Sequence, residues 1–277
     1  MYQANLKLLL LLLPFVLAGT AFAGTVTLTG SCIQENTTYG KISFILVNSG
    51  NQSASSLSVV PSIIGSGKFY PVYTYNELVP GTQINLSISN LDINGSGIYP
   101  AYFNVSYRQG AALYSDVFPC TSGIKIGNAT VSSEIMLTYG ISNTSSGYVI
   151  GVNALNAGYG TANATIGLVA PGGLDFSGQS AYNIEMRPGH TYSINFTLSN
   201  MAGGYSSYTA MLYATYRSGN YTHSTISDIA IRESHPKSHV LGDLVIFIGI
   251  FAFLIVVALL ARIALIRSMR KMVKQFK

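Results

Sequence analysis

Two cysteines are the residues whose chemistry depends most on the compartment that holds the chain. Cys32 and Cys120 are the only cysteines among the 277 residues. An even pair is typical of a disulfide in an oxidising compartment, and two free thiols are the alternative. A bridge would close a long loop and stabilise the fold by about 4–5 kcal/mol through chain entropy. We therefore predict a disulfide, provided that the chain is exported.

Asparagine acceptors for N-linked glycans are the most numerous candidate sites. Residues 24–240 contain 50 Ser and Thr and 17 Asn, so chance would supply about four Asn-x-Ser/Thr triplets. Ten are present. We expect glycosylation, with a merely Asn-rich polar surface as the alternative. The acceptors are Asn36, Asn51, Asn85, Asn94, Asn104, Asn128, Asn143, Asn163, Asn195 and Asn220.

Three tyrosines follow one another at a period near two. Tyr70, Tyr73 and Tyr75 form an aromatic stripe. If the stripe is exposed, it could stack on sugars or anchor a partner protein. Packing across neighbouring strands is the alternative.

Metal-binding and catalytic patterns are weak. His235 and His239 are four residues apart, as ligands on one helix face would be, but Pro236 lies between them. We interpret this stretch as a solvated stalk. The acidic residues are scattered and suggest no acid–base pair. We expect no catalytic residue, metal site or cofactor, and a non-enzyme; an ectoenzyme or metal protein is the alternative.

The first apolar run predicts a secretory signal peptide over residues 1–23. Lys7, a Leu-rich stretch and Ala21-Phe22-Ala23 give the three-part layout, with a cut between Ala23 and Gly24. An uncleaved membrane anchor is the alternative.

The second apolar run predicts a membrane span. Leu244–Ala261 carries no charge, and its length of ~27 Å as a helix matches the hydrocarbon core of a bilayer. We assign a stalk to 233–240, a transmembrane helix to 241–263 and a basic tail to 264–277. Six basic residues follow Ala261, so the C-terminus is expected in the cytoplasm and the N-terminus outside the plasma membrane. The tail could contact anionic membrane lipid.

The charge of the chain belongs to its ends. The formal net charge is +5, yet residues 24–240 contain eight Lys and Arg against nine Asp and Glu. No basic face can be built from this balance, which excludes a nucleic-acid partner.

The exported part repeats itself. Val47-Asn48-Ser49-Gly50 returns as Leu155-Asn156-Ala157-Gly158, and Val79-Pro80-Gly81 returns as Arg187-Pro188-Gly189. On either side of these motifs, apolar residues alternate with their neighbours, as in strands of an antiparallel sandwich. Examples are Ile42, Phe44 and Leu46, and Ile84, Leu86 and Ile88. We predict an all-β chain with two tandem immunoglobulin-like β-sandwich domains, at 24–122 and 127–232, plus one C-terminal transmembrane helix.

These motifs resemble those of a known family. Asn48 and Gly50 with Ala54, followed by Pro80-Gly81, are similar to CARDB-type and related immunoglobulin-like adhesion modules of prokaryotic surface proteins; the second unit matches through Asn156, Gly158, Ala162 and Pro188-Gly189. The resemblance implies surface display and binding or spacing. The Tyr, Ser and Asn bias without Trp favours an archaeal source.

Together these features predict a single-pass cell-surface glycoprotein with an adhesion, recognition or cell-envelope role. A protein or glycan partner outside the cell is expected. The alternative is an accessory subunit of a membrane complex, such as a secretion, translocon-associated or appendage assembly.

Overall fold

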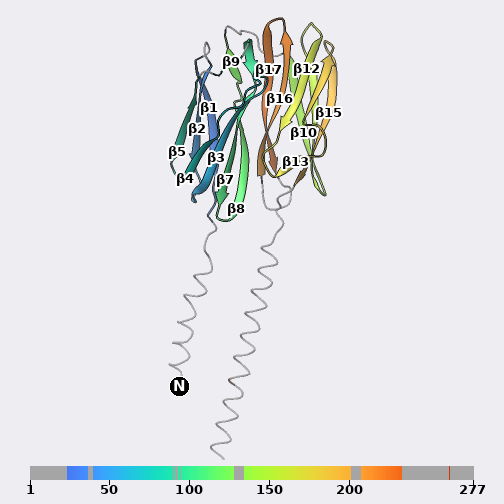
Figure 1. Ribbon diagram of the computed structural model, residues 1–277. Coiled ribbons are helices and arrows are strands. Elements are labelled where there is room, and N and C mark those ends of the chain that lie inside the picture. Colours follow the sequence, from blue (N-terminus) through green and yellow to red (C-terminus); the bar gives the residue numbers. More distant parts are fainter. Residues whose placement is uncertain are drawn as a thin grey trace, which may run out of the picture. The chain divides into compact units, whose positions relative to one another are not determined.

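A computed structural model describes residues 24–36, 40–89, 91, 93, 95–127, 134–200, 207–232 and 262 (Figure 1). The predicted signal peptide, stalk and tail lie outside these residues, and so does the predicted span apart from Arg262. No helix in the described part of the chain is both long and apolar enough to cross a membrane.

Alternating burial explains why the chain forms strands. In Lys41–Asn48, every second residue is buried, including Ile42, Phe44 and Leu46. Successive side chains of a strand point to opposite faces, so this period of two turns one face toward a core. All elements described from 24 to 232 are strands, which confirms the all-β prediction.

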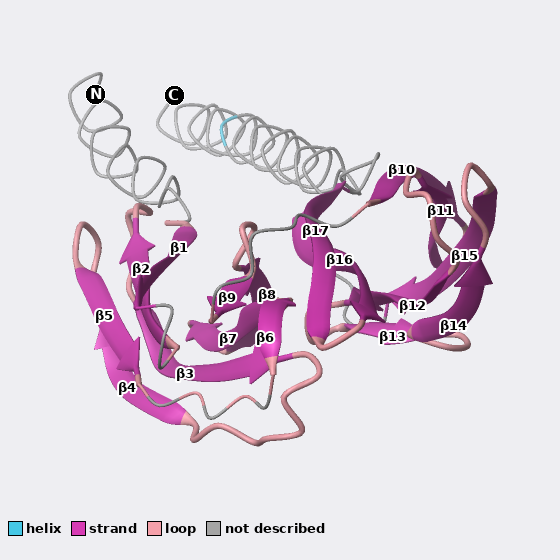
Figure 2. Cartoon of the chain, turned by 90° about the horizontal axis from the view of Figure 1, so that it is seen from above, coloured by secondary structure: helices cyan, strands magenta, loops and turns pink. Residues whose placement is uncertain are grey.

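The first sandwich encloses one hydrophobic core between two antiparallel sheets. The ring of Phe44 from one sheet stacks on Phe103 from the other, with centroids 4.0 Å apart. One sheet has the order β1-β2-β5 and the other β4-β3-β7-β8 (Figure 2). The strands are β1 (Leu28–Asn36), β2 (Lys41–Asn48), β3 (Ala54–Ile63), β4 (Tyr73–Leu78), β5 (Gln83–Ile88), β7 (Ala101–Gln109) and β8 (Ala112–Pro119).

The second sandwich repeats this plan around a core of its own. One sheet has the order β10-β11-β15-β13, and the other begins β14-β12-β16-β17. We call the two sandwiches the first and second copy of the repeat. A short strand, β13, lies beside β15 in the second copy. The strands are β10 (Ile135–Thr144), β11 (Gly147–Asn156), β12 (Ala162–Val169), β13 (Leu174–Phe176), β14 (Ala181–Met186), β15 (Thr191–Asn200), β16 (Ser207–Ser218) and β17 (Tyr221–Arg232).

A strand pair from the first copy continues a sheet of the second. β6 (Ser96–Tyr99) runs parallel to the start of β17 and pairs on its other side with β9 (Ile124–Ile126). The hydroxyl of Ser224 on β17 donates to the carbonyl of Ile98 at 2.6 Å. The two copies therefore share a six-stranded sheet.

The outer faces of two strands also meet between the copies. Val117 on β8 packs with Met211 and Tyr213 on β16 in a small buried cluster. The backbone N–H of Gly172 donates to the Ser115 hydroxyl at 3.1 Å. The residues up to Arg232 form one compact unit, and the boundaries at 24–122 and 127–232 stay predictions.

Candidate functional site

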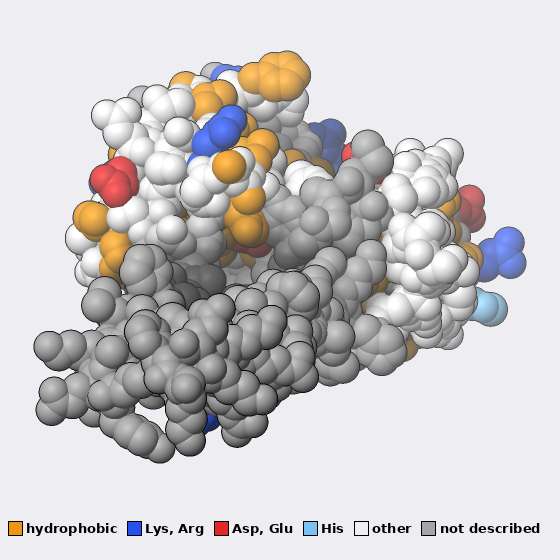
Figure 3. Space-filling view, turned by 90° about the horizontal axis from the view of Figure 1, so that it is seen from below, with side chains coloured by type: hydrophobic (Ala, Val, Ile, Leu, Met, Phe, Trp, Pro, Cys, Tyr) orange, Lys and Arg blue, Asp and Glu red, His pale blue; other side chains and the backbone are white. Residues whose placement is uncertain are grey.

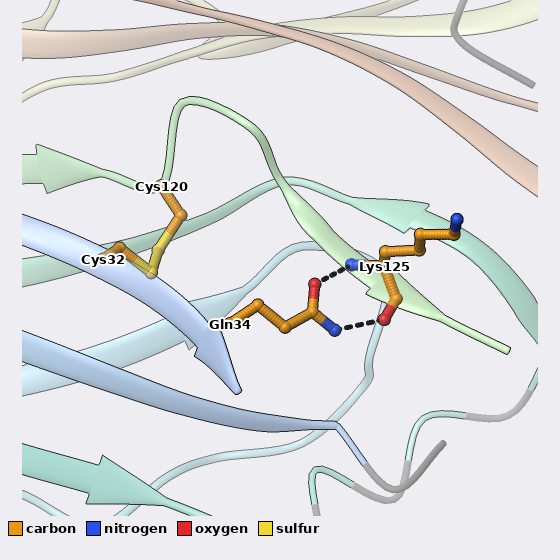
Figure 4. Close-up of a disulfide and its surroundings, with 4 residues drawn as sticks. All are labelled: Cys32, Gln34, Cys120 and Lys125. Carbon is orange, nitrogen blue, oxygen red and sulfur yellow. Dashed lines mark hydrogen bonds between the residues drawn. A yellow bond between two sulfur atoms is a disulfide. The ribbon is translucent and has the colours of Figure 1, made fainter. Parts of the chain in front are cut away.

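The cysteine pair ties the first strand of the first sandwich to the end of its last long strand. Cys32 lies on β1 and Cys120 directly follows β8. Their sulfur atoms are joined at 2.10 Å, and the two positions have a sequence separation of 88 (Figure 4). The predicted disulfide is therefore present.

A side-chain clamp lies beside the disulfide. Gln34 comes two residues after Cys32 and points toward Lys125 on β9 (Figure 4). The backbone N–H of Lys125 donates to the Gln34 side-chain oxygen at 2.8 Å, and the Gln34 amide donates to the Lys125 carbonyl. The side-chain amide of Gln34 thus bonds both backbone groups of Lys125, as a neighbouring strand would. This holds β9 against the disulfide-linked end of the sandwich.

The repeated Asn-x-Gly motif is a buried hydrogen-bond centre in the first copy. Asn48 is fully buried at the end of β2. Its amide donates to the carbonyls of Gln52 and Leu78, at 2.8 and 2.9 Å, and its side-chain oxygen accepts from the N–H of Gly50 at 3.0 Å. Its backbone carbonyl accepts from the N–H of Gly81 at 2.8 Å. The side chain therefore satisfies three backbone groups that would otherwise lack partners.

The second copy has the same bonds. Asn156 donates to the carbonyls of Gly160 and Met186, at 2.8 and 2.9 Å, and accepts from Gly158 at 3.0 Å. The N–H of Gly189 donates to the Asn156 carbonyl at 2.7 Å. Gly81 and Gly189 have φ of 75° and 69°, a left-handed conformation that glycine adopts without a steric cost. The motif that dominates the sequence repeat is thus a structural lock between strand end and turn.

Most of the sequon asparagines that the structure describes face solvent. Asn36 lies on β1, although its side chain is outside the described part, and Asn94 and Asn128 are outside it altogether. Figure 3 shows one face of the molecule, on which the described Lys, Arg, Asp and Glu side chains are few and scattered. Glycosylation stays a prediction, and the exposed acceptors meet its steric requirement. The exposed acceptors are Asn51, Asn85, Asn143, Asn163, Asn195 and Asn220.

Asn104 differs from the other acceptors. It lies on β7, is half-buried and accepts a hydrogen bond from the Ser115 hydroxyl at 3.0 Å. The same hydroxyl accepts from Gly172 of the second copy. Asn104 therefore lies at the contact between the copies, where a glycan would compete with that contact.

The tyrosine stripe is half-buried. Tyr70, Tyr73 and Tyr75 all pack against the core of the first sandwich. The Tyr70 hydroxyl donates to the carbonyl of Leu91 at 3.1 Å. A binding patch at these tyrosines stays a prediction, and their contacts favour the packing alternative.

The described ionisable groups do not converge. No cluster of three or more His, Cys, Asp and Glu side chains that could hold a metal ion occurs in the described part of the chain. His235 and His239 lie outside it. His223 is buried and stacks on Tyr216 with ring centroids 5.0 Å apart, and its Nδ1 has no hydrogen-bond partner among the described residues.

Asp116 on β8 is the acidic group that the fold perturbs most clearly. Burial raises the pKa of its carboxyl group to about 6, and a hydrogen bond from the Tyr107 hydroxyl at 3.5 Å opposes the shift. No second acid or base lies beside it in the contacts described. Because this pKa differs from the ordinary value of the group, Asp116 makes the stability of the fold depend on pH.

Comparison with known proteins identifies no family. Neither a protein-family model nor a curated protein matches the chain. Among solved structures, red sea bream transglutaminase is 12% identical over 73% of this chain and 30% of its own, with a TM-score of 0.27. The native conformation of Escherichia coli alpha-2-macroglobulin is 11% identical over 76% of this chain and 17% of its own, with a TM-score of 0.29. The chain spans less than a third of either protein, and at these TM-scores the similarity supports no functional assignment.

Sequence reasoning missed two of these features. Asn48 and Asn156 were recognised only as members of the repeated motif, whereas their side chains are buried hydrogen-bond centres. Their return at one offset was the available signal. Gln34 carries no such signal, because its partner Lys125 lies in a segment that no pattern connects to it.

Proposed function

We propose that this chain is a single-pass cell-surface glycoprotein whose two immunoglobulin-like sandwiches are displayed outside the plasma membrane for adhesion, recognition or envelope structure. The C-terminal apolar run is the anchor, and the basic tail lies in the cytoplasm. A protein or glycan outside the cell is the partner.

The disulfide carries this proposal. Cys32 and Cys120 are bonded, and such bonds persist in oxidising compartments and are rare in reducing ones. The exposed sequons support the same placement, because N-glycans are added to exported chains at accessible asparagines. The sparse surface charge supports contact through polar and aromatic groups rather than through a strong electrostatic field.

Surface labelling of intact cells of the source organism tests the placement. A membrane-impermeant amine reagent should label Lys41 and Lys68, which lie in the first sandwich, and should leave Lys271 and Lys274 of the tail unlabelled until the membrane is opened. Labelling of the tail lysines on intact cells would overturn the orientation.

Glycopeptide mass spectrometry tests the second part. Asn51, Asn143, Asn163 and Asn195 are expected to carry glycans, and Asn104 is the internal control that should remain bare because it lies at the contact between the copies. An ectodomain without any glycan would remove the glycoprotein assignment.

A further inference from the structure

The first sandwich has one long sheet edge that nothing described covers. β5 is the last strand of its sheet and pairs only with β2 among the described residues. The Asn48 N–H donates to the Thr82 carbonyl at 3.1 Å, and bonding alternates along an antiparallel strand. The N–H and C=O groups of Gln83, Asn85 and Ser87 therefore point away from β2. No described residue bonds to them.

The second copy shows this edge in a covered form. The carbonyl of Thr197 accepts from the N–H of Ser177 at 2.9 Å, and that of Asn195 accepts from the Tyr182 hydroxyl at 3.3 Å. β13 pairs with the last residues of β15. Asn195 and Thr197 correspond to Asn85 and Ser87 in the repeat. The same edge is thus covered in the second sandwich, whereas in the first sandwich no described residue pairs with it.

β5 lacks the features that usually protect an edge. Gln83–Ile88 contains no charged residue and no proline, and its pairing with β2 has no bulge. Leu86 and Ile88 face the core, whereas Asn85 and Ser87 face solvent. A regular uncharged edge of this kind readily accepts another strand.

Exposed apolar side chains lie near both ends of this edge. The loop before β4 carries Phe69, which is fully exposed, and Val72, which is 58% exposed. The hydrogen bond from Tyr70 to Leu91 holds this loop beside the segment that follows β5. Val79, 47% exposed, lies in the turn that precedes β5. The two ends are thus apolar, and the strand between them is polar on its outer face.

We propose that a second molecule of this protein adds its own β5 to the β5 edge as an antiparallel strand. Asn85 of one molecule then lies opposite Asn85 of the other. In this register Gln83 of one molecule faces Ser87 of the other, so the outward N–H and C=O groups of both β5 strands are hydrogen-bonded. The core-facing residues of both molecules stay on one side of the joined sheet.

The charges near the edge fit this arrangement. Lys68 lies in the exposed loop near the end of β5, and Glu77 lies on β4 close to the turn that leads into β5. Antiparallel addition brings the end of one β5 to the start of the other. Lys68 of each molecule then approaches Glu77 of the other molecule, and Phe69 of each approaches Val79 of the other. A parallel addition would instead place like charges together.

Crosslinking through an introduced cysteine tests the pairing. Asn85→Cys in the full chain adds one thiol to a protein whose native cysteines are bonded to each other. The protein is made in an exporting host without N-glycosylation and purified in detergent, so the outcome does not depend on the glycans of the proposed function. Mild oxidation should convert Asn85→Cys into a crosslinked dimer on a non-reducing gel. The matched control, Asn195→Cys, should pair through β5 like the wild type but remain uncrosslinked on the gel, because the edge of β15 is covered.

A charge exchange supplies a second readout. Light scattering should give the dimer mass for the wild type, a shift toward the monomer for Lys68→Glu, and the dimer mass again for Lys68→Glu with Glu77→Lys. A wild type that stays monomeric, or equal crosslinking at positions 85 and 195, would overturn the proposal. Failure of the charge pair to restore the dimer would overturn the antiparallel register.

Discussion

A single asparagine in each copy determines how the strand end and the following turn are held. Asn48 and Asn156 each donate two hydrogen bonds and accept one, inside a protein layer that water does not reach. Leaving a buried backbone group without a partner costs about 1–3 kcal/mol. One polar side chain is therefore expected to affect stability about as much as a large buried apolar residue.

We expect Asn48→Ala and Asn156→Ala each to lower the free energy of unfolding by about 2–4 kcal/mol, because three backbone groups lose their partners. Denaturant titration of the full chain in detergent measures the loss. Asn76→Ala, at an exposed position on β4, is the control and should stay within about 0.5 kcal/mol of the wild type. Equal values for Asn48→Ala and Asn76→Ala would contradict the role of the lock.

Asp116 gives the stability a dependence on pH. Its pKa is about 6 in the folded chain and 3.8 in the reference state, so the folded state holds the proton more tightly. Its contribution is fully present below the lower value and is lost as pH rises through the higher one. The total is at most about 3 kcal/mol.

Asp116→Asn should remove this dependence. Relative to the variant, the wild type is expected to lose stability between about pH 4 and pH 7, as measured by denaturant midpoints across that range. Two parallel profiles would show that Asp116 does not titrate in this way.

Among the strands, β9 depends on covalent and side-chain links more than on a long ladder, and β1 carries both of those links. β9 has three residues and is held by β6 on one side and by the Gln34 amide on the other. The disulfide fixes the chain just before it. Reduction should therefore affect the first sandwich selectively.

Changing both Cys32 and Cys120 to Ser should destabilise the first sandwich by up to about 4–5 kcal/mol, because the unfolded chain regains the entropy of the closed loop. Hydrogen exchange followed by mass spectrometry should show faster exchange in β1 and β9 and unchanged exchange in β11 and β15, whose core contains no disulfide. Equal acceleration in both cores would contradict this assignment.

Periodic segments were readily predicted from the sequence, whereas edge relations were not. The alternation around Phe44 and Leu86 predicts strands and their buried faces, because period two is local information. The edge of β15 is covered by Tyr182, Ser177 and the three-residue strand β13. No described residue covers the corresponding edge of β5. None of these covering groups has a periodic signature, and the two copies look equivalent until their partners are known.

At the scale of the whole molecule, the two copies are joined through a shared sheet as well as through the chain. Gly97 allows this junction, since a Cβ at that position would lie 2.4 Å from the Thr222 carbonyl oxygen and 2.6 Å from its nitrogen. The sequence repeat does not predict this contact. β6 belongs to the first copy and β17 to the second, and their pairing is not repeated within either copy.

Gly97→Ala should separate β6 from β17 while leaving each core intact. We expect loss of hydrogen-exchange protection at Ser96–Tyr99 and at the start of β17, with protection unchanged at Phe103 and Phe196. Gly140→Ala, where an added Cβ meets no atom within 4 Å, is the control. Unchanged protection at β6 would show that the junction tolerates a side chain.

The shared sheet also fixes an order of assembly. The bond between Ser224 and Ile98 spans 126 positions of the chain, so β6 and β9 have no partner strand in the second copy until β17 has been synthesised and exported. The disulfide at Cys120 can form well before that. A newly exported chain would therefore hold a nearly finished first sandwich in which the paired strands β6 and β9 still lack β17. Arrival of β17 would complete the shared sheet. Chains that stall before residue 221 would leave the edge of β6 exposed, where quality-control proteases and chaperones recognise unpaired strands.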